Sequence, residues 1–319
     1  MNIVDAPAMN SSFRVWRRSI HDSIVMIDGK RVTIVIVFIA LVTLVLATPL
    51  QAQVLDRAQD FYRTTTRSWL GPMEGIARRL YVTLATLEVA VGALTWFGRR
   101  DGLDEMATKL LLKFVLLSFV LLLITGAGFW LPPLINSLAA AGQSAGIVAP
   151  PATPSEVVDT GNYIAFTVIS TSGVPITPDS FAALFFALGA RFIVYASFAI
   201  VAVMLVLSWV ESYVALGAGV LFLGFGGFRA TAQYADNYLN YLIYLGIRLF
   251  AVYLLLMIGT AIVQTFIPPT MKATNSEAQA TVAAICLVFA VLTVRVPGNM
   301  AGRIATGGSF GLANALRNL

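Results

Sequence analysis

Long, uninterrupted apolar stretches dominate the chain, and strict alternation of apolar and polar positions is rare. A helix that crosses a membrane needs ~20 largely apolar residues, with a working range of about 17–25. Seven stretches satisfy or nearly satisfy this requirement: Val32–Leu50, Leu80–Phe97, Leu110–Leu131, Phe181–Val210, Ser212–Phe228, Leu239–Ile267 and Ala278–Val294. The pattern predicts an all-α fold, a polytopic transmembrane helical bundle of about 6–7 spans.

The composition excludes most other classes of protein. Of the 319 residues, 58% are hydrophobic and 12% are charged, whereas a soluble domain has roughly 25% charged residues. The mean hydropathy of +0.82 is too apolar for a folded surface in water. The net charge of +5 fits basic residues that hold loops on the cytoplasmic side.

Enzyme chemistry lacks candidate residues. Cys286 is the only cysteine and His21 the only histidine, so an internal disulfide, a Cys/His zinc site and histidine-based nucleophilic catalysis are not expected. The glycine-rich run near residue 225 has no following lysine of the phosphate-loop type. We therefore expect no catalytic residue, no metal and no cofactor.

The first 79 residues divide into three segments. Residues 1–31 are a basic cytoplasmic segment. Residues 32–52 are interpreted as an uncleaved signal anchor, with a cleaved signal peptide as the alternative, because Leu50-Gln51-Ala52 resembles a peptidase site. Either alternative places the following residues outside the cytoplasm.

Residues 53–79 are amphipathic. Apolar side chains at near-helical spacing alternate with arginines, namely Val54, Ala58, Phe61, Tyr62 and Trp69 with Arg57, Arg63 and Arg67. This pattern predicts an interfacial helix on the periplasmic face of the membrane. A helix that packs on neighbouring protein has the same pattern, and the sequence leaves that alternative open.

Charge sets the expected orientation. The hairpin at residues 80–131 has Arg99, Arg100 and Lys109 around its central loop, which places that loop in the cytoplasm. The loop at residues 132–180 has no lysine or arginine but holds Glu156, Asp159 and Asp179. We therefore expect a periplasmic loop there.

This loop is expected to be structured. Pro132 and Pro133 are predicted to end the preceding helix. The run Thr153-Pro154-Ser155-Glu156 has the N-cap, proline and acidic positions of a helix start. Thr177-Pro178 repeats the first two of these positions, so the loop is predicted to hold short helices.

Residues 181–296 form the predicted C-terminal membrane core, and residues 297–319 the tail. Glu211 separates two apolar runs with almost no loop, which predicts a tight helical hairpin or a second run that re-enters the membrane. Seven full spans would place the tail outside, although Arg295, Arg303 and Arg317 favour the cytoplasm. Residues 212–228 are therefore the best candidate for an incomplete span.

Four ionisable residues inside predicted spans are candidate functional residues: Glu88, Arg191, Glu211 and Arg248. A charge near the bilayer centre costs at least ~2.5 kcal/mol. One interpretation is a polar pathway or proton site. We favour the structural alternative, in which Arg248 pairs with Glu211 or Glu88 and fixes helix packing.

Several motifs occur in a recognisable order. They are Val210-Glu211-Ser212-Tyr213, the run GAGVLFLGFGG at 217–227, FRATAQYADNYL at 228–239, Gly246-Ile247-Arg248-Leu249, and RVPGNMAG at 295–302. Together they resemble the TrbL family of polytopic subunits of conjugative type IV secretion systems. Residues that carry the resemblance include Phe225, Gly226, Gly227, Arg229, Pro297 and Gly298.

The resemblance implies a channel or scaffold subunit in the bacterial inner membrane. It implies a role in translocating DNA or protein and in anchoring the periplasmic stalk or pilus base. The implied partners are pilin-like and stalk proteins, an inner-membrane ATPase complex, the transported substrate, the lipid bilayer and further copies of the chain. A small-solute transporter or another permease is the alternative function.

Overall fold

The computed structural model describes residues 52–98, 103–145, 151, 153–169, 178–266 and 276–305. The first predicted span, the basic segment before it and residues 306–319 of the predicted tail lie outside the described residues. The described residues form helices and no strand, which confirms the all-α prediction. The elements are α2 (Ala52–Gly98), α3 (Leu103–Thr125), α4 (Ala127–Gln143), α5 (Pro154–Tyr163), the π-helix η2 (Ile164–Val168), α6 (Pro178–Ala218), the 3₁₀ helix η3 (Gly219–Gly227), α7 (Ala232–Phe266) and α8 (Ser276–Ala305).

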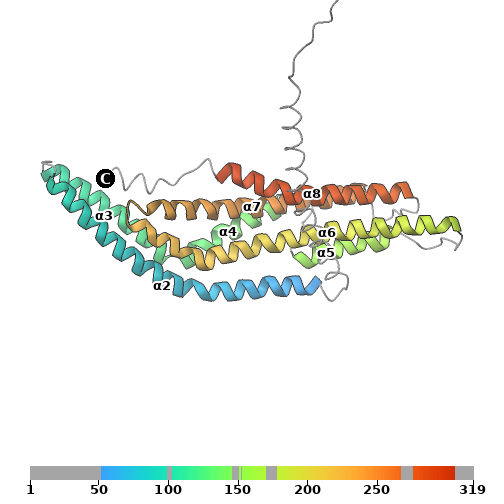
Figure 1. The fold of residues 1–319 in the computed structure, drawn as a ribbon, viewed down its shortest axis with the longest axis horizontal. Coiled ribbons are helices and arrows are strands. Elements are labelled where there is room, and N and C mark those ends of the chain that lie inside the picture. Colours follow the sequence, from blue (N-terminus) through green and yellow to red (C-terminus); the bar gives the residue numbers. More distant parts are fainter. Residues whose placement is uncertain are drawn as a thin grey trace, which may run out of the picture. The chain divides into compact units, whose positions relative to one another are not determined.

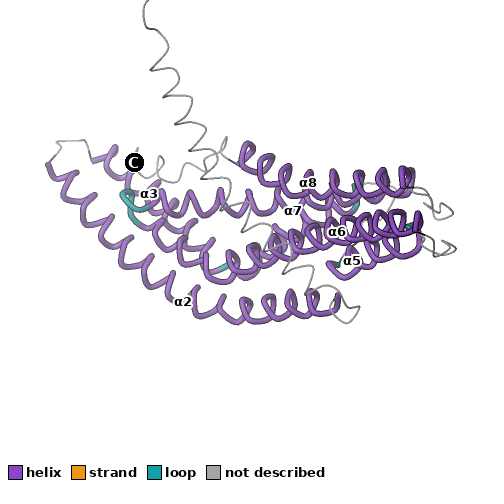
Figure 2. The backbone as a smooth tube through the Cα atoms, turned by 45° about the vertical axis from the view of Figure 1, so that its right-hand side comes forward, coloured by secondary structure: helices purple, strands orange, loops and turns teal. Residues whose placement is uncertain are grey.

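The helices pack lengthwise on one another (Figures 1 and 2). α6 packs on α8 and α2, and α7 packs on α4 and α8. α2 runs parallel to the end of α6 and to η3, because Thr66 lies against Gly217 and Tyr81 lies against Gly227. α3 then returns along α2, where the Tyr81 hydroxyl donates a hydrogen bond to the Leu117 carbonyl over 2.5 Å.

α2 joins two segments that the sequence analysis treated separately. It is one helix of 47 residues with Pro72 inside it, so no boundary falls at residue 79. Thr66 and Ala77 are buried on its inner face, against α6 and η3. Of the two alternatives for residues 53–79, the contacts therefore show the helix packed on neighbouring protein, and an interfacial location remains a prediction.

The prediction that Pro132 and Pro133 end a helix is wrong. The break occurs at Gly126, and α4 continues through both prolines. Trp130 Nε1 donates to the Leu123 carbonyl over 2.9 Å, which gives a partner to a carbonyl beside the break. Burial of Leu131 and Ile135 offsets the cost of interior prolines, so much of the predicted loop at 132–180 is helix packed in the core.

The start of α5 follows the sequence prediction. Thr153 is the N-cap, its side chain accepts a hydrogen bond from the Glu156 amide, and Pro154 occupies the first turn. This part of the prediction is confirmed because a cap is a local property of the chain.

Of the two alternatives predicted at Glu211, the tight hairpin is wrong. α6 runs through Glu211 without a break, continues as η3, and the chain turns only at Phe228–Thr231. One charged residue does not end a helix when its side chain finds partners outside it. Four elements of the described chain are long and apolar enough to cross a membrane, namely Ala107–Thr125, Phe186–Gly227, Ala232–Ile262 and Ser276–Ala305.

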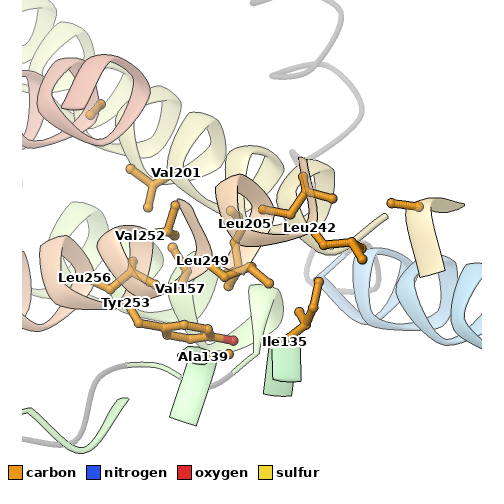
Figure 3. Close-up of a cluster of buried hydrophobic side chains, with 14 of the residues drawn as sticks. Ile135, Ala139, Val157, Val201, Leu205, Leu242, Leu249, Val252, Tyr253 and Leu256 are labelled. Carbon is orange, nitrogen blue, oxygen red and sulfur yellow. The ribbon is translucent and has the colours of Figure 1, made fainter. Parts of the chain in front are cut away.

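A buried apolar cluster joins α4, α5, α6 and α7 (Figure 3). Its labelled members are Ile135, Ala139, Val157, Val201, Leu205, Leu242, Leu249, Val252, Tyr253 and Leu256. Helix α5 contributes Val157 to this cluster, so the connecting segment between α4 and α6 is part of the core.

Candidate functional site

The glycine-rich segment η3 lies directly on the backbone of α2. A Cβ atom at Gly224 would lie 2.7 Å from the Ala77 carbonyl oxygen, and one at Gly227 would lie 2.7 Å from the Tyr81 carbonyl oxygen. Only glycine allows so close an approach between two helices. These positions therefore bring the chain after Gly227 close to the second half of α2.

The other side of η3 is aromatic. The Phe225 ring packs against Tyr234 with centroids 5.6 Å apart, and Phe222 packs against Tyr238 at 6.2 Å. The aromatic–Gly–Gly motif thus has one role for each part: Phe225 contacts α7, whereas Gly226 lies beside Val120 of α3 and Gly227 beside α2.

Glu88 is the centre of the first charged cluster. Its side chain is fully buried, and Lys113 Nζ of α3 lies 2.7 Å from Oε1. The Arg229 backbone amide donates to Oε2 over 3.1 Å, and Arg229 Nε lies 3.9 Å from the same oxygen. One carboxylate thus links α2, α3 and the turn after η3.

This pairing was not among the predicted ones, because Lys113 lies near the start of its apolar stretch and could extend towards water. A usable indication was present. Glu88 lies ten residues before the end of α2 and Lys113 ten residues after the start of α3, so an antiparallel hairpin brings them to the same level. A buried charge that loses such a partner costs about 3–5 kcal/mol.

The second charged cluster joins α6 to α7. Arg248 forms an ion pair with Glu211, and the Tyr241 hydroxyl donates to Glu211 Oε1 over 2.9 Å. The structure thus pairs Arg248 with one of the two carboxylates that the sequence analysis considered. The Glu211 side chain is 34% exposed, so this pair is less buried than the Glu88 cluster.

Arg191 has a different environment. Its Nε and one terminal nitrogen donate to the Ile169 carbonyl over 3.1 and 2.8 Å, and its guanidinium lies 5.6 Å from the centre of the Phe166 ring. A cation at the carboxyl end of a helix interacts favourably with the helix dipole. Arg191 therefore holds the end of η2 against α6.

The last two motif residues, Pro297 and Gly298, lie inside α8. Pro297 is buried, and α8 continues beyond it to Ala305. A Cβ atom at Gly298 would lie 3.8 Å from the Tyr244 hydroxyl. Neither residue contributes a reactive group, and their positions indicate helix packing.

The described residues contain no group of three or more histidine, cysteine, aspartate or glutamate side chains that could hold a metal. Glu88 and Glu211 each contact a basic side chain. This arrangement aligns helices, and it offers no free nucleophile or general base in the described part of these clusters.

A comparison with known families decides the classification. The profile described as "TrbL/VirB6 plasmid conjugal transfer protein" matches residues 80–296, which is more than half of the chain. The chain belongs to the TrbL/VirB6 family. The matched region includes η3 and both charged clusters, whereas Pro297, Gly298 and the first half of α2 lie outside it.

Two relatives have names that agree with this membership. The chain is 27% identical over 270 residues to "Conjugal transfer protein TrbL" of Rhizobium radiobacter, covering 84% of this chain and 67% of the relative. It is 26% identical over 250 residues to "Probable conjugal transfer protein TrbL" of Sinorhizobium fredii (strain NBRC 101917 / NGR234), covering 78% of this chain and 63% of the relative. The matches thus span about two thirds of each relative.

Proposed function

We propose that the chain is an inner-membrane channel or scaffold subunit of a conjugative type IV secretion machine. The observation that carries the proposal is the TrbL/VirB6 match, which covers residues 80–296, from the second half of α2 into α8. The chain would help to move DNA or protein and would anchor the periplasmic stalk or pilus base. Pilin-like proteins, stalk proteins, the secretion ATPase complex and further copies of the chain are the proposed partners.

The structure supports a scaffold role through the nature of its charged clusters. Glu88 and Glu211 are engaged by Lys113, Arg229 and Arg248, so the clusters fix helices relative to one another. A solute transporter uses mid-membrane polar groups to bind its substrate. Ion pairs between helices are better suited to fixing the relative positions of those helices, so that other subunits can assemble on them.

The unbroken α6 also bears on the topology. Because α6 and η3 together make one candidate span, we propose six crossings, the lower of the two predicted numbers: 32–50, 80–97, α3, α6 with η3, α7 and α8. With the amino end inside, an even number of crossings would agree with a cytoplasmic carboxyl end, which Arg295 and Arg303 favour. A reporter fused after Leu319 is therefore expected to be active only in its cytoplasmic form.

Deletion in the native host tests the function. An in-frame deletion should reduce the number of transconjugants per donor by orders of magnitude without slowing donor growth, and the gene supplied in trans should restore transfer. A complementing copy with Gly71→Ala, which meets no atom within 4 Å, is the control for expression. Normal transfer by the deletion strain would overturn the proposal, and a solute-dependent growth defect with normal transfer would favour a transporter.

A further inference from the structure

η3 is an unusually long 3₁₀ helix. It has nine residues, Gly219–Gly227, and it follows α6 without a break. The hydrogen bonds of a 3₁₀ helix are less well aligned than those of an α-helix, so runs longer than about 3–4 residues are uncommon. The 3₁₀ form of η3 therefore needs support from the elements that pack on it.

The sequence of η3 has the three-residue period of a 3₁₀ helix. Residues i and i+3 lie on the same side of such a helix. Phe222 and Phe225 face α7, with their rings stacked and their centroids 6.4 Å apart. Val220 and Leu223, which are fully buried, share a second side, and the two glycines that contact α2 share the third. Each side thus carries one kind of residue.

The glycine side matches the repeat of α2. Gly224 lies against the Ala77 carbonyl and Gly227 against the Tyr81 carbonyl. Three residues of a 3₁₀ helix make one turn and rise about 6 Å, and four residues of an α-helix also rise about 6 Å. In an α-helix, the second glycine would point about 60° away from the first. The two glycines therefore meet successive turns of α2 only while η3 is a 3₁₀ helix.

An α-helix over the same nine residues would be shorter and differently turned. Nine residues rise about 18 Å at ~2.0 Å each, but about 13.5 Å at ~1.5 Å each. They make about three turns as a 3₁₀ helix and about two and a half turns as an α-helix. Conversion would therefore draw the end of η3 about 4.5 Å towards α6 and rotate it by about half a turn.

The Glu88 cluster holds the end of η3 in its observed position. The Arg229 backbone amide, two residues after η3, donates to Glu88 Oε2 over 3.1 Å. Lys113 Nζ lies 2.7 Å from the other oxygen of the same carboxylate, so Glu88 is itself fixed. A shift of about 4.5 Å exceeds the range of any hydrogen bond, so conversion to an α-helix would break the contact between Glu88 and Arg229.

We propose that η3 is a conformational switch, a 3₁₀ helix while it is docked on α2 and an α-helix once it leaves α2. The docked form has the glycine contacts and the bond to Glu88, whereas the α form has better aligned backbone hydrogen bonds. The turn at Phe228–Thr231 joins η3 directly to α7, so the start of α7 moves with the end of η3. The Glu88 cluster is thereby coupled to the position of α7, whatever the chain transports.

The change in length is measured on the full-length protein, purified in detergent in a Cys286→Ala background. Spin labels at Leu207→Cys on α6 and Gln233→Cys on α7, both exposed, lie before and after η3. Double electron–electron resonance should give one distance for wild-type η3. Gly227→Ala, whose Cβ atom would lie 2.7 Å from the Tyr81 carbonyl oxygen, should shorten this distance by about 4–5 Å.

Gly226→Ala is the matched control. It makes the same substitution one residue earlier, but its Cβ atom would meet a side-chain methyl of Val120 at 3.1 Å and no backbone atom. It should therefore keep the wild-type distance. Equal shortening in both variants would assign the effect to the helix propensity of alanine and would overturn the role of docking. A wild-type distance in Gly227→Ala would overturn the switch.

A second variant leaves η3 itself unchanged. Glu88→Met/Lys113→Met removes the carboxylate that accepts from Arg229 and replaces the buried ion pair with apolar side chains of similar volume, a change that folded proteins often tolerate. The shorter distance should appear in this variant, at least as a second population. If Gly227→Ala does not fold, this variant decides the outcome. The wild-type distance alone in the folded double variant would overturn the proposal.

Discussion

Alanine at Gly227 places a methyl group where the backbone of α2 already lies. Its Cβ atom would be 2.7 Å from the Tyr81 carbonyl oxygen and 3.0 Å from the Ala85 amide nitrogen. Both atoms belong to a helix backbone, so no side-chain rotation relieves the contact. The two elements must separate, and separation also moves Arg229 away from Glu88.

The magnitude follows from overpacking and from the effect on the Glu88 cluster. Overpacking in a close-packed interior costs about 1–3 kcal/mol, and the upper end is expected because backbone must move. Gly226→Ala should cost less, because its nearest atom is a side-chain methyl of Val120 at 3.1 Å. Gly75→Ala meets nothing within 4 Å and should be neutral or stabilising by about 1 kcal/mol in a helix interior.

We expect thermal melting to rank the stabilities of these variants. The variants are purified in detergent, heated, and assayed by size-exclusion chromatography with fluorescence detection. The expected ranking of melting temperature is Gly75→Ala at or above the wild type, then Gly226→Ala, then Gly227→Ala. If the Gly227→Ala protein had the same melting temperature as the Gly75→Ala protein, η3 would not pack on α2 as described. It would also remove the structural explanation of the glycine motif.

Three further predictions address local contacts. Glu88→Gln should lower the protein level in membranes, measured by immunoblot, because it leaves buried Lys113 without its counter-charge at a cost of about 3–5 kcal/mol. Adding Lys113→Met should restore part of the protein level, and no restoration would contradict the pairing. Arg248→Leu should lower protein level or transfer more than Arg248→Lys, and Glu211→Gln should recover part of the loss; a silent Arg248→Leu would show that the pair is dispensable. Thr153→Ala should lower the melting temperature by an amount equivalent to about 1 kcal/mol, because it removes the cap of α5, and an unchanged value would assign the capping role to water.

The comparison of sequence and structure separates local from non-local properties. The lengths of the apolar stretches and the scarcity of charged residues were sufficient for an all-helical membrane protein, because hydrocarbon requires every backbone group to be bonded within a helix. The capping residues at Thr153 and Pro154 predicted the start of α5, because a cap involves only neighbouring residues. The order of the motifs from residue 210 to residue 302 predicted the TrbL family, which the family profile confirms.

Tertiary packing decided where helices end and which charges meet. Pro132 and Glu211 both looked like interruptions, yet helices run through each of them. The helix continues at Pro132 because its buried face packs in the core, and at Glu211 because the carboxylate reaches Arg248. Glu88 meets Lys113 because the hairpin is antiparallel, and Arg229 because η3 follows α2 closely through its glycines. These partners lie up to 141 residues apart in the chain, so only the packed structure brings them together.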